Sequence, residues 1–97
     1  MPEITVRPID RQSDMSTFHV DIRDEESSTE HEVTLSARDY DRLGTEYGTP
    51  EEFVRACFEF LLDREPKESI LPGFDVSMIS RYFPEFESTI QGFDPTS

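Results

Sequence analysis

The stretch TPEEFVRACFEFLLDR, residues 49–64, decides the fold because its pattern predicts a central helix. Thr49 is a favourable N-cap residue, Pro50 suits the first helical turn, and Glu52 completes a Thr-x-x-Glu capping box. Pro66 makes continuation costly, so we expect the helix to end near Arg64.

Apolar side chains occupy more than half of the circumference of this helix. At about 100° per residue, the polar residues fall within one arc and the apolar residues fill the remainder. The apolar set is Phe53, Val54, Cys57, Phe58, Phe60 and Leu61, with Leu62 at the polar edge. So wide an apolar arc needs cover on two sides, either from the rest of this chain or from a second copy.

Two segments before the helix alternate between apolar and polar residues, as half-buried strands do. They are Thr17–Arg23 and Glu30–Ser36, and their predicted core face consists of Phe18, Val20, Ile22, Val33 and Leu35. A loosely alternating segment, Met1–Ile9, predicts a further strand that Pro8 ends or confines to an edge.

The charges favour one register for the predicted hairpin. Pairing Ile22 with Val33 places Arg23 opposite Glu32, whereas slipping by two residues sets Asp21 against Glu32. Like charges directly opposite one another are destabilising, so we expect the first register, with residues 24–30 as an acidic loop.

Short helices are expected on both sides of the central helix. Ser36 is placed to cap a helix over about residues 37–43 that Gly44 ends, and Asp75 to cap another over about residues 76–83. The sequence thus predicts an α+β fold, with a sheet of two or three antiparallel strands packed on the helix at about 50–64. Residues 1–86 form a single domain in this interpretation, and residues 87–97 a loose C-terminal tail.

The charge of the chain is extreme. Its 97 residues include 22 acidic and 9 basic residues, which give a formal net charge of −13. Such a surface repels nucleic acid and anionic membranes, which argues against both as partners. Lys67 is the only lysine, and this composition is typical of proteins from salt-rich cytoplasms, where self-repulsion is screened. The competing interpretation is an acidic docking surface for a basic partner.

The cysteine and hydropathy patterns favour the cytoplasm. Cys57 is the only cysteine and lies on the apolar arc, which indicates a buried small hydrophobe and excludes an internal disulfide. The sequence has no charged-then-apolar leader and no long apolar run, so we expect neither a signal peptide nor a membrane span.

No arrangement of residues points to catalysis, a cofactor or a metal. His19 and His31 are the only histidines, and both are expected at the surface of the hairpin, with no GxSxG motif to supply a nucleophile. His19 and Asp21 point the same way on one strand, but the third metal ligand would have to be Thr34 or Ser36, which are poor ligands. We therefore expect a non-enzymatic protein without cofactors.

Two resemblances to known families follow from particular segments. FEFLLDREPKESIL and FDVSMISRYFPEF, between Phe58 and Phe86, resemble small acidic bacterial proteins of an uncharacterised family, which implies a module but no activity. Residues 32–65 partly resemble ribbon-helix-helix repressors. In those dimers a strand from each of the two subunits enters the major groove of DNA. The solvent-facing strand positions here are Glu32, Thr34 and Ser36, without the basic residues that read bases.

Apolar residues concentrate between Phe58 and Phe86, where Leu62, Phe74 and Phe83 are candidates for a partner-binding patch. The alternative is that all of them close the core. The expected function is a non-enzymatic protein–protein interaction or adaptor module of the cytoplasm, monomeric rather than homodimeric. The alternative function is a ribbon-helix-helix-like transcriptional regulator or antitoxin.

Overall fold

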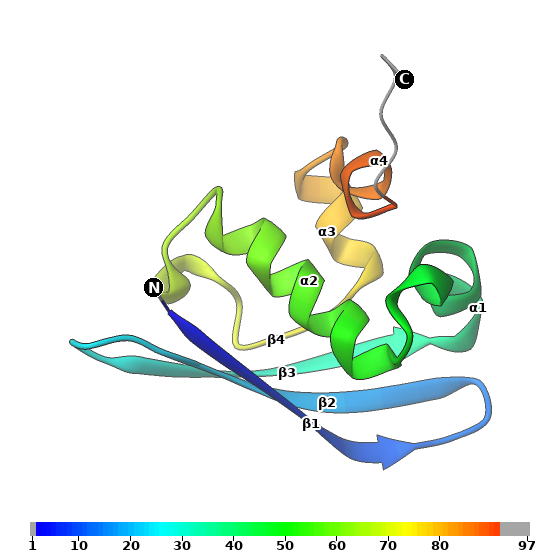
Figure 1. Ribbon diagram of the computed structural model, residues 1–97, viewed down its shortest axis with the longest axis horizontal. Coiled ribbons are helices and arrows are strands. Elements are labelled where there is room, and N and C mark those ends of the chain that lie inside the picture. Colours follow the sequence, from blue (N-terminus) through cyan, green and yellow to red (C-terminus); the bar gives the residue numbers. More distant parts are fainter. Residues whose placement is uncertain (1, 92–97) are drawn as a thin grey trace.

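The computed structural model describes residues 2–91 as an α+β fold, with helices packed on one face of a four-stranded sheet (Figure 1). The strands are β1 (Glu3–Arg11), β2 (Met15–Arg23), β3 (Ser28–Ser36) and β4 (Gly73–Asp75), in that spatial order. β1, β2 and β3 are antiparallel neighbours, and β4 runs parallel to β3.

The helical segments follow the third and fourth strands. The central helix is α2 (Pro50–Leu62), and before it come α1 (Ala37–Asp39), the π-helical turn η1 (Tyr40–Gly44) and the 3-10 turn η2 (Thr45–Tyr47). After it come the 3-10 turn η3 (Lys67–Ser69), α3 (Ser77–Tyr82) and α4 (Phe86–Ile90). None of the helices within residues 2–91 combines the length and apolar character needed to cross a bilayer.

Helix α2 confirms the prediction made from its sequence. The Thr49 hydroxyl accepts a hydrogen bond from the Glu52 backbone N–H at 3.2 Å, and Pro50 occupies the first turn. The buried side chains are the six expected ones: Phe53, Val54, Cys57, Phe58, Phe60 and Leu61. The helix ends at Leu62, two residues before the expected position. A tighter turn follows it before Pro66, in which the Arg64 N–H donates to the Leu61 carbonyl three residues back at 3.0 Å.

The predicted face of the sheet is also confirmed. Phe18, Val20, Ile22, Val33 and Leu35 are all buried beneath α2. Pro8 does lie in an edge strand, but β1 continues past it to Arg11 through a bulge between Pro8 and Asp10. An edge position tolerates proline because the missing N–H faces no partner strand.

The predicted hairpin register is wrong. Ile22 pairs with Thr29 rather than Val33, Phe18 takes Val33 as its partner, and Arg23 lies opposite Ser28. This register keeps the same apolar face because the shift is an even number of residues. It also sets Asp21 directly opposite Glu30, a like-charge pair of the kind that the sequence argument excluded.

A tight turn explains this register. The expected acidic loop of residues 24–30 is shorter in the structure, because β3 already begins at Ser28 and only residues 24–27 form the turn. The Asp24 backbone N–H donates to the Ser27 carbonyl at 3.0 Å. The Asp24 carboxylate accepts from the N–H groups of Glu26 and Ser27 at 2.9 and 3.0 Å. Three local bonds outweigh one exposed like-charge pair, which costs only about 0.2–1 kcal/mol.

The expected helix over residues 37–43 forms as a shorter and less regular one. Ser36 caps α1 as predicted, with its hydroxyl accepting from the Asp39 N–H at 3.0 Å. Gly44 does not end the helix through a left-handed conformation, since the positive φ belongs to Gly48. A residue larger than glycine does not fit at position 44, because its Cβ would lie 2.6 Å from the Tyr40 ring and 2.9 Å from that of Phe53.

The C-terminal part of the fold departs most from expectation. β4 was not predicted, and α3 begins at Ser77 rather than Val76. The Asp75 carboxylate still supports its start by accepting from the Ser77 N–H at 3.0 Å. The loose tail expected from residue 87 is wrong as far as Gln91, because α4 packs Phe86 and Ile90 into the core. Residues 92–97 of that expected tail lie outside the described residues.

The only lysine of the chain holds the β2–β3 turn against η3. The Lys67 ammonium donates to Asp24 at 2.6 Å and to Glu68 at 2.9 Å, and its side chain is only 6% exposed. The bond from Lys67, assisted by the N–H groups of Glu26 and Ser27, lowers the pKa of Asp24 from 3.8 to about 2.

We predict that Asp24→Asn lowers the stability of the protein at neutral pH but not in strong acid. A carboxyl whose pKa is depressed in the folded state stabilises fully above its ordinary value of 3.8, and this contribution is lost as the pH falls through about 2. Urea unfolding across this pH range measures the difference from wild type. Glu25→Gln removes the same charge from the same turn without these bonds, so an equal effect of both variants would contradict the assignment.

Candidate functional site

An apolar groove lies between the end of α2 and the segment that follows it. Its volume is about 340 Å³. Eight of its ten lining residues are apolar or aromatic, and the two others are Glu65 and Ser69. The eight are Leu61, Ile70, Leu71, Phe74, Met78, Ile79, Tyr82 and Phe83.

Backbone turns place the two walls of the groove. Pro66 and Pro72 redirect the chain after α2, so that residues 69–71 form one wall and α3 forms the other. β4 fixes the base, because the Glu32 N–H donates to the Pro72 carbonyl at 2.8 Å and the Val76 N–H to the Thr34 carbonyl at 3.0 Å. The groove therefore exists without a partner.

The rim of the groove exposes large apolar groups. The Tyr82 residue is 64% exposed and Leu71 is 45% exposed, while Ile70 and Ile79 beneath them are buried. Exposed apolar groups gathered beside a concavity are typical of binding surfaces, whereas scattered ones are ordinary. Ile9 and Met15 are exposed to a similar degree, but on strands of the sheet and away from the groove lining.

The predicted patch of Leu62, Phe74 and Phe83 agrees with this groove in part. Phe74 and Phe83 line it, while Leu62 is half-buried and does not. The sequence reasoning placed Leu71 and Tyr82 in the same apolar region but did not single them out. The spacing of Met78 and Tyr82, four residues apart on one helical face, was the signal that could have found the α3 wall.

A buried histidine anchors the Leu71 wall to the sheet. His31 was expected at the surface, at the start of its strand, but it shares the core face with Val33, and the actual register sets it opposite Val20, where it is 3% exposed. Nδ1 donates to the Leu71 carbonyl at 2.7 Å, and Nε2 lies 2.9 Å from the Thr29 hydroxyl. The ring also packs against Phe58, with 5.5 Å between centroids.

An arginine lies near two aromatic rings, and one of them, Phe83, lines the groove. The Arg64 guanidinium lies 3.6 Å above the Phe60 ring and 6.0 Å from that of Phe83. It also pairs with Glu85 at 3.1 Å, and the pKa of Glu85 is lowered by its hydrogen bond from the Glu85 backbone N–H and then by this bond from Arg64. By contrast, Glu65 makes no ion pair with any residue between 2 and 91, which leaves a free carboxylate in the groove lining.

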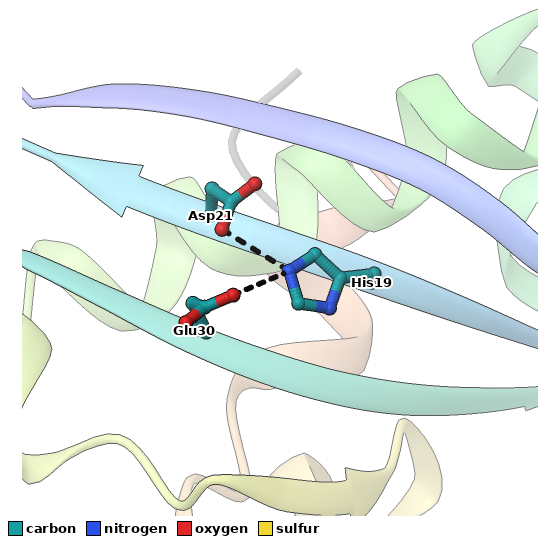
Figure 2. Close-up of side chains that lie close together, drawn as sticks. All are labelled: His19, Asp21 and Glu30. Carbon is teal, nitrogen blue, oxygen red and sulfur yellow. Dashed lines mark hydrogen bonds and ion pairs between the residues drawn. The ribbon is translucent and has the colours of Figure 1, made fainter.

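A second cluster lies on the face of the sheet that none of the helices in residues 2–91 covers (Figures 1 and 2). The His19 ring, expected to face Ser36, instead lies between the carboxylates of Asp21 and Glu30. Nε2 is 3.1 Å from an oxygen of each. Glu30 thus takes the place for which the sequence offered only Thr34 or Ser36.

The two remaining candidates, Cys57 and the strand of the ribbon-helix-helix resemblance, are enclosed by other parts of the fold. Cys57 is fully buried, which raises the pKa of its thiol strongly and makes it unreactive. The strand of the ribbon-helix-helix resemblance pairs over Glu32–Thr34 with β4 as well as with β2. A second subunit would have to displace β4 before it could pair with that part of the strand.

Comparison of the chain with models of protein families, with curated proteins and with solved structures gives no match. Both family resemblances remain predictions from the sequence.

We predict that His31→Leu destabilises the protein by about 1–3 kcal/mol, because a buried ring loses its bonds to the Leu71 carbonyl and to Thr29. Urea unfolding in the presence of a chelator measures the change. His19→Gln is the control, because the partly exposed His19 ring contacts only side chains on the other face of the sheet, so its loss is expected to cost less than that of His31. Equal effects of the two variants would contradict the anchoring role of His31.

Proposed function

We propose that the protein is a non-enzymatic interaction or adaptor module of the cytoplasm that holds an apolar side chain of a partner protein in the groove. The observation that carries this proposal is the pairing of a concave apolar lining with the exposed rings and branches of Tyr82 and Leu71. Aromatic side chains that become buried on binding are frequent anchors of protein–protein contacts.

Charge suggests the chemistry of the partner. Glu65 offers a carboxylate in the groove lining that pairs with no basic residue between 2 and 91, and the chain as a whole carries a net charge of −13. A partner segment with an apolar anchor next to an arginine or lysine would satisfy both features. Long-range attraction would also speed its association, an effect that weakens as salt rises.

The packing around α2 favours a monomer rather than a homodimer. Both sides of the apolar arc of α2 are covered from within, by the sheet on one side and by Ile79, Phe86 and Ile90 on the other. The groove is therefore left for a different molecule. The acidic composition is consistent with a salt-rich cytoplasm, and tests of binding belong at that ionic strength.

We predict that a tagged wild-type chain captures specific proteins from native lysate and that the double variant Leu71→Ser/Tyr82→Ala does not. Both side chains are largely exposed, so their loss removes contact area without unfolding the chain. Truncation of an aromatic anchor that binding buries costs about 2 kcal/mol or more, which lowers affinity by more than tenfold. Quantitative identification of the bound proteins and nucleic acid measures the effect.

Ile9→Ser is the matched control, because Ile9 is an equally exposed apolar residue on β1, outside the groove. Circular dichroism confirms that each variant is folded. Equal capture by the wild type and the groove variant would contradict the proposal. Salt-dependent retention of nucleic acid in place of protein would favour the alternative regulator.

A further inference from the structure

The His19 ring and two carboxylates, those of Asp21 and Glu30, meet on the exposed face of β2 and β3. Asp21 lies two residues after His19 on β2 and so points to the same side of the sheet. Glu30 lies on β3 directly opposite Asp21. Figure 2 shows both carboxylates turned toward Nε2 of the His19 ring.

The spacing of these groups suits a metal ion. Nε2 lies 3.1 Å from Asp21 Oδ1 and 3.1 Å from Glu30 Oε1, and the three ligand atoms lie within 4.8 Å of one another. Bonds of about 2.0–2.2 Å to a first-row divalent ion place neighbouring ligand atoms about 3.0–3.5 Å apart in octahedral or tetrahedral geometry. Small rotations of two carboxylates would complete that geometry.

The electrostatics of the cluster also favour a cation. Asp21 and Glu30 face each other across the two strands, where like charges are destabilising. Among residues 2–91, neither carboxylate lies within ion-pair distance of an arginine or lysine, and His19 is the only basic group that touches them. A divalent ion would neutralise both carboxylates at once.

We propose that His19, Asp21 and Glu30 form a binding site for a divalent transition-metal ion, with zinc as the test ion. His19 supplies the imidazole nitrogen that favours zinc over magnesium, and the carboxylates supply one oxygen each. Three protein ligands leave positions for water or for a ligand from another molecule. The Glu30 side chain, 71% exposed, is the ligand that binding orders most.

The site is independent of the proposed function. Its ligands lie on β2 and β3 of the uncovered face, while the groove lies among the helices and β4. Each proposal can therefore fail without the other. Because the strands position the ligands before the ion arrives, binding adds to the stability of a fold that already exists.

The test is a titration of the full-length, chelator-treated chain with zinc chloride, followed by calorimetry and by the ring nitrogen signals of ¹⁵N-labelled His19. We expect saturable binding of one zinc ion, a change at Nε2 of His19, and a rise in melting temperature. His19→Gln, Asp21→Asn and Glu30→Gln should each weaken binding by at least about tenfold, since even outer-shell partners of metals contribute that much. Magnesium should bind more weakly than zinc.

Glu32→Gln is the control, because Glu32 lies directly opposite His19 in the register and loses the same charge without being one of the ligands. If Glu32→Gln lost as much zinc affinity as Asp21→Asn, the ion would be attracted diffusely by an acidic surface, and the proposal would be overturned. An unchanged His19 signal, or no saturable zinc binding, would overturn it as well.

Discussion

Helix α2 carries six buried side chains around its axis, and a single sheet face cannot cover all of them. The sheet covers one side through Phe18, Val20 and Ile22 of β2 and through Val33 and Leu35 of β3. The segment from Ile70 to Ile90 covers the other. This requirement explains why the chain folds back after Pro66 to add β4, α3 and α4, and why one buried cluster extends from Ile4 to Ile90.

The groove is a consequence of how that second cover is built. Two short helices and a three-residue strand enclose α2 less completely than a long helix would, so Leu71 and Tyr82 remain exposed beside buried Ile70 and Ile79. His31 ties one wall to the sheet, and Arg64 stacks on Phe60 next to the groove residue Leu61. The contacts of His31 and Arg64 therefore help to complete the fold and also position residues around the groove.

The sequence predicts the elements whose signals are local and strong. The cap at Thr49, the apolar arc of α2 and the alternation of β2 and β3 all appear in the structure as expected. The register could not be read from alternation, because even shifts preserve the face, and the bonds within the Asp24 turn decided it. That shift buried His31 and brought Glu30 beside His19. β4 is too short for a periodic signal, and it forms only because β3 offers it an edge.

The central claim is that one chain supplies both covers of α2. Sedimentation equilibrium combined with amide hydrogen exchange tests this most directly. We predict the mass of a single chain over a wide concentration range, with the N–H groups of Glu32 and Val76, which hold β4, exchanging as slowly as those in the middle of α2. A dimer mass together with rapid exchange at these two amides would contradict the account.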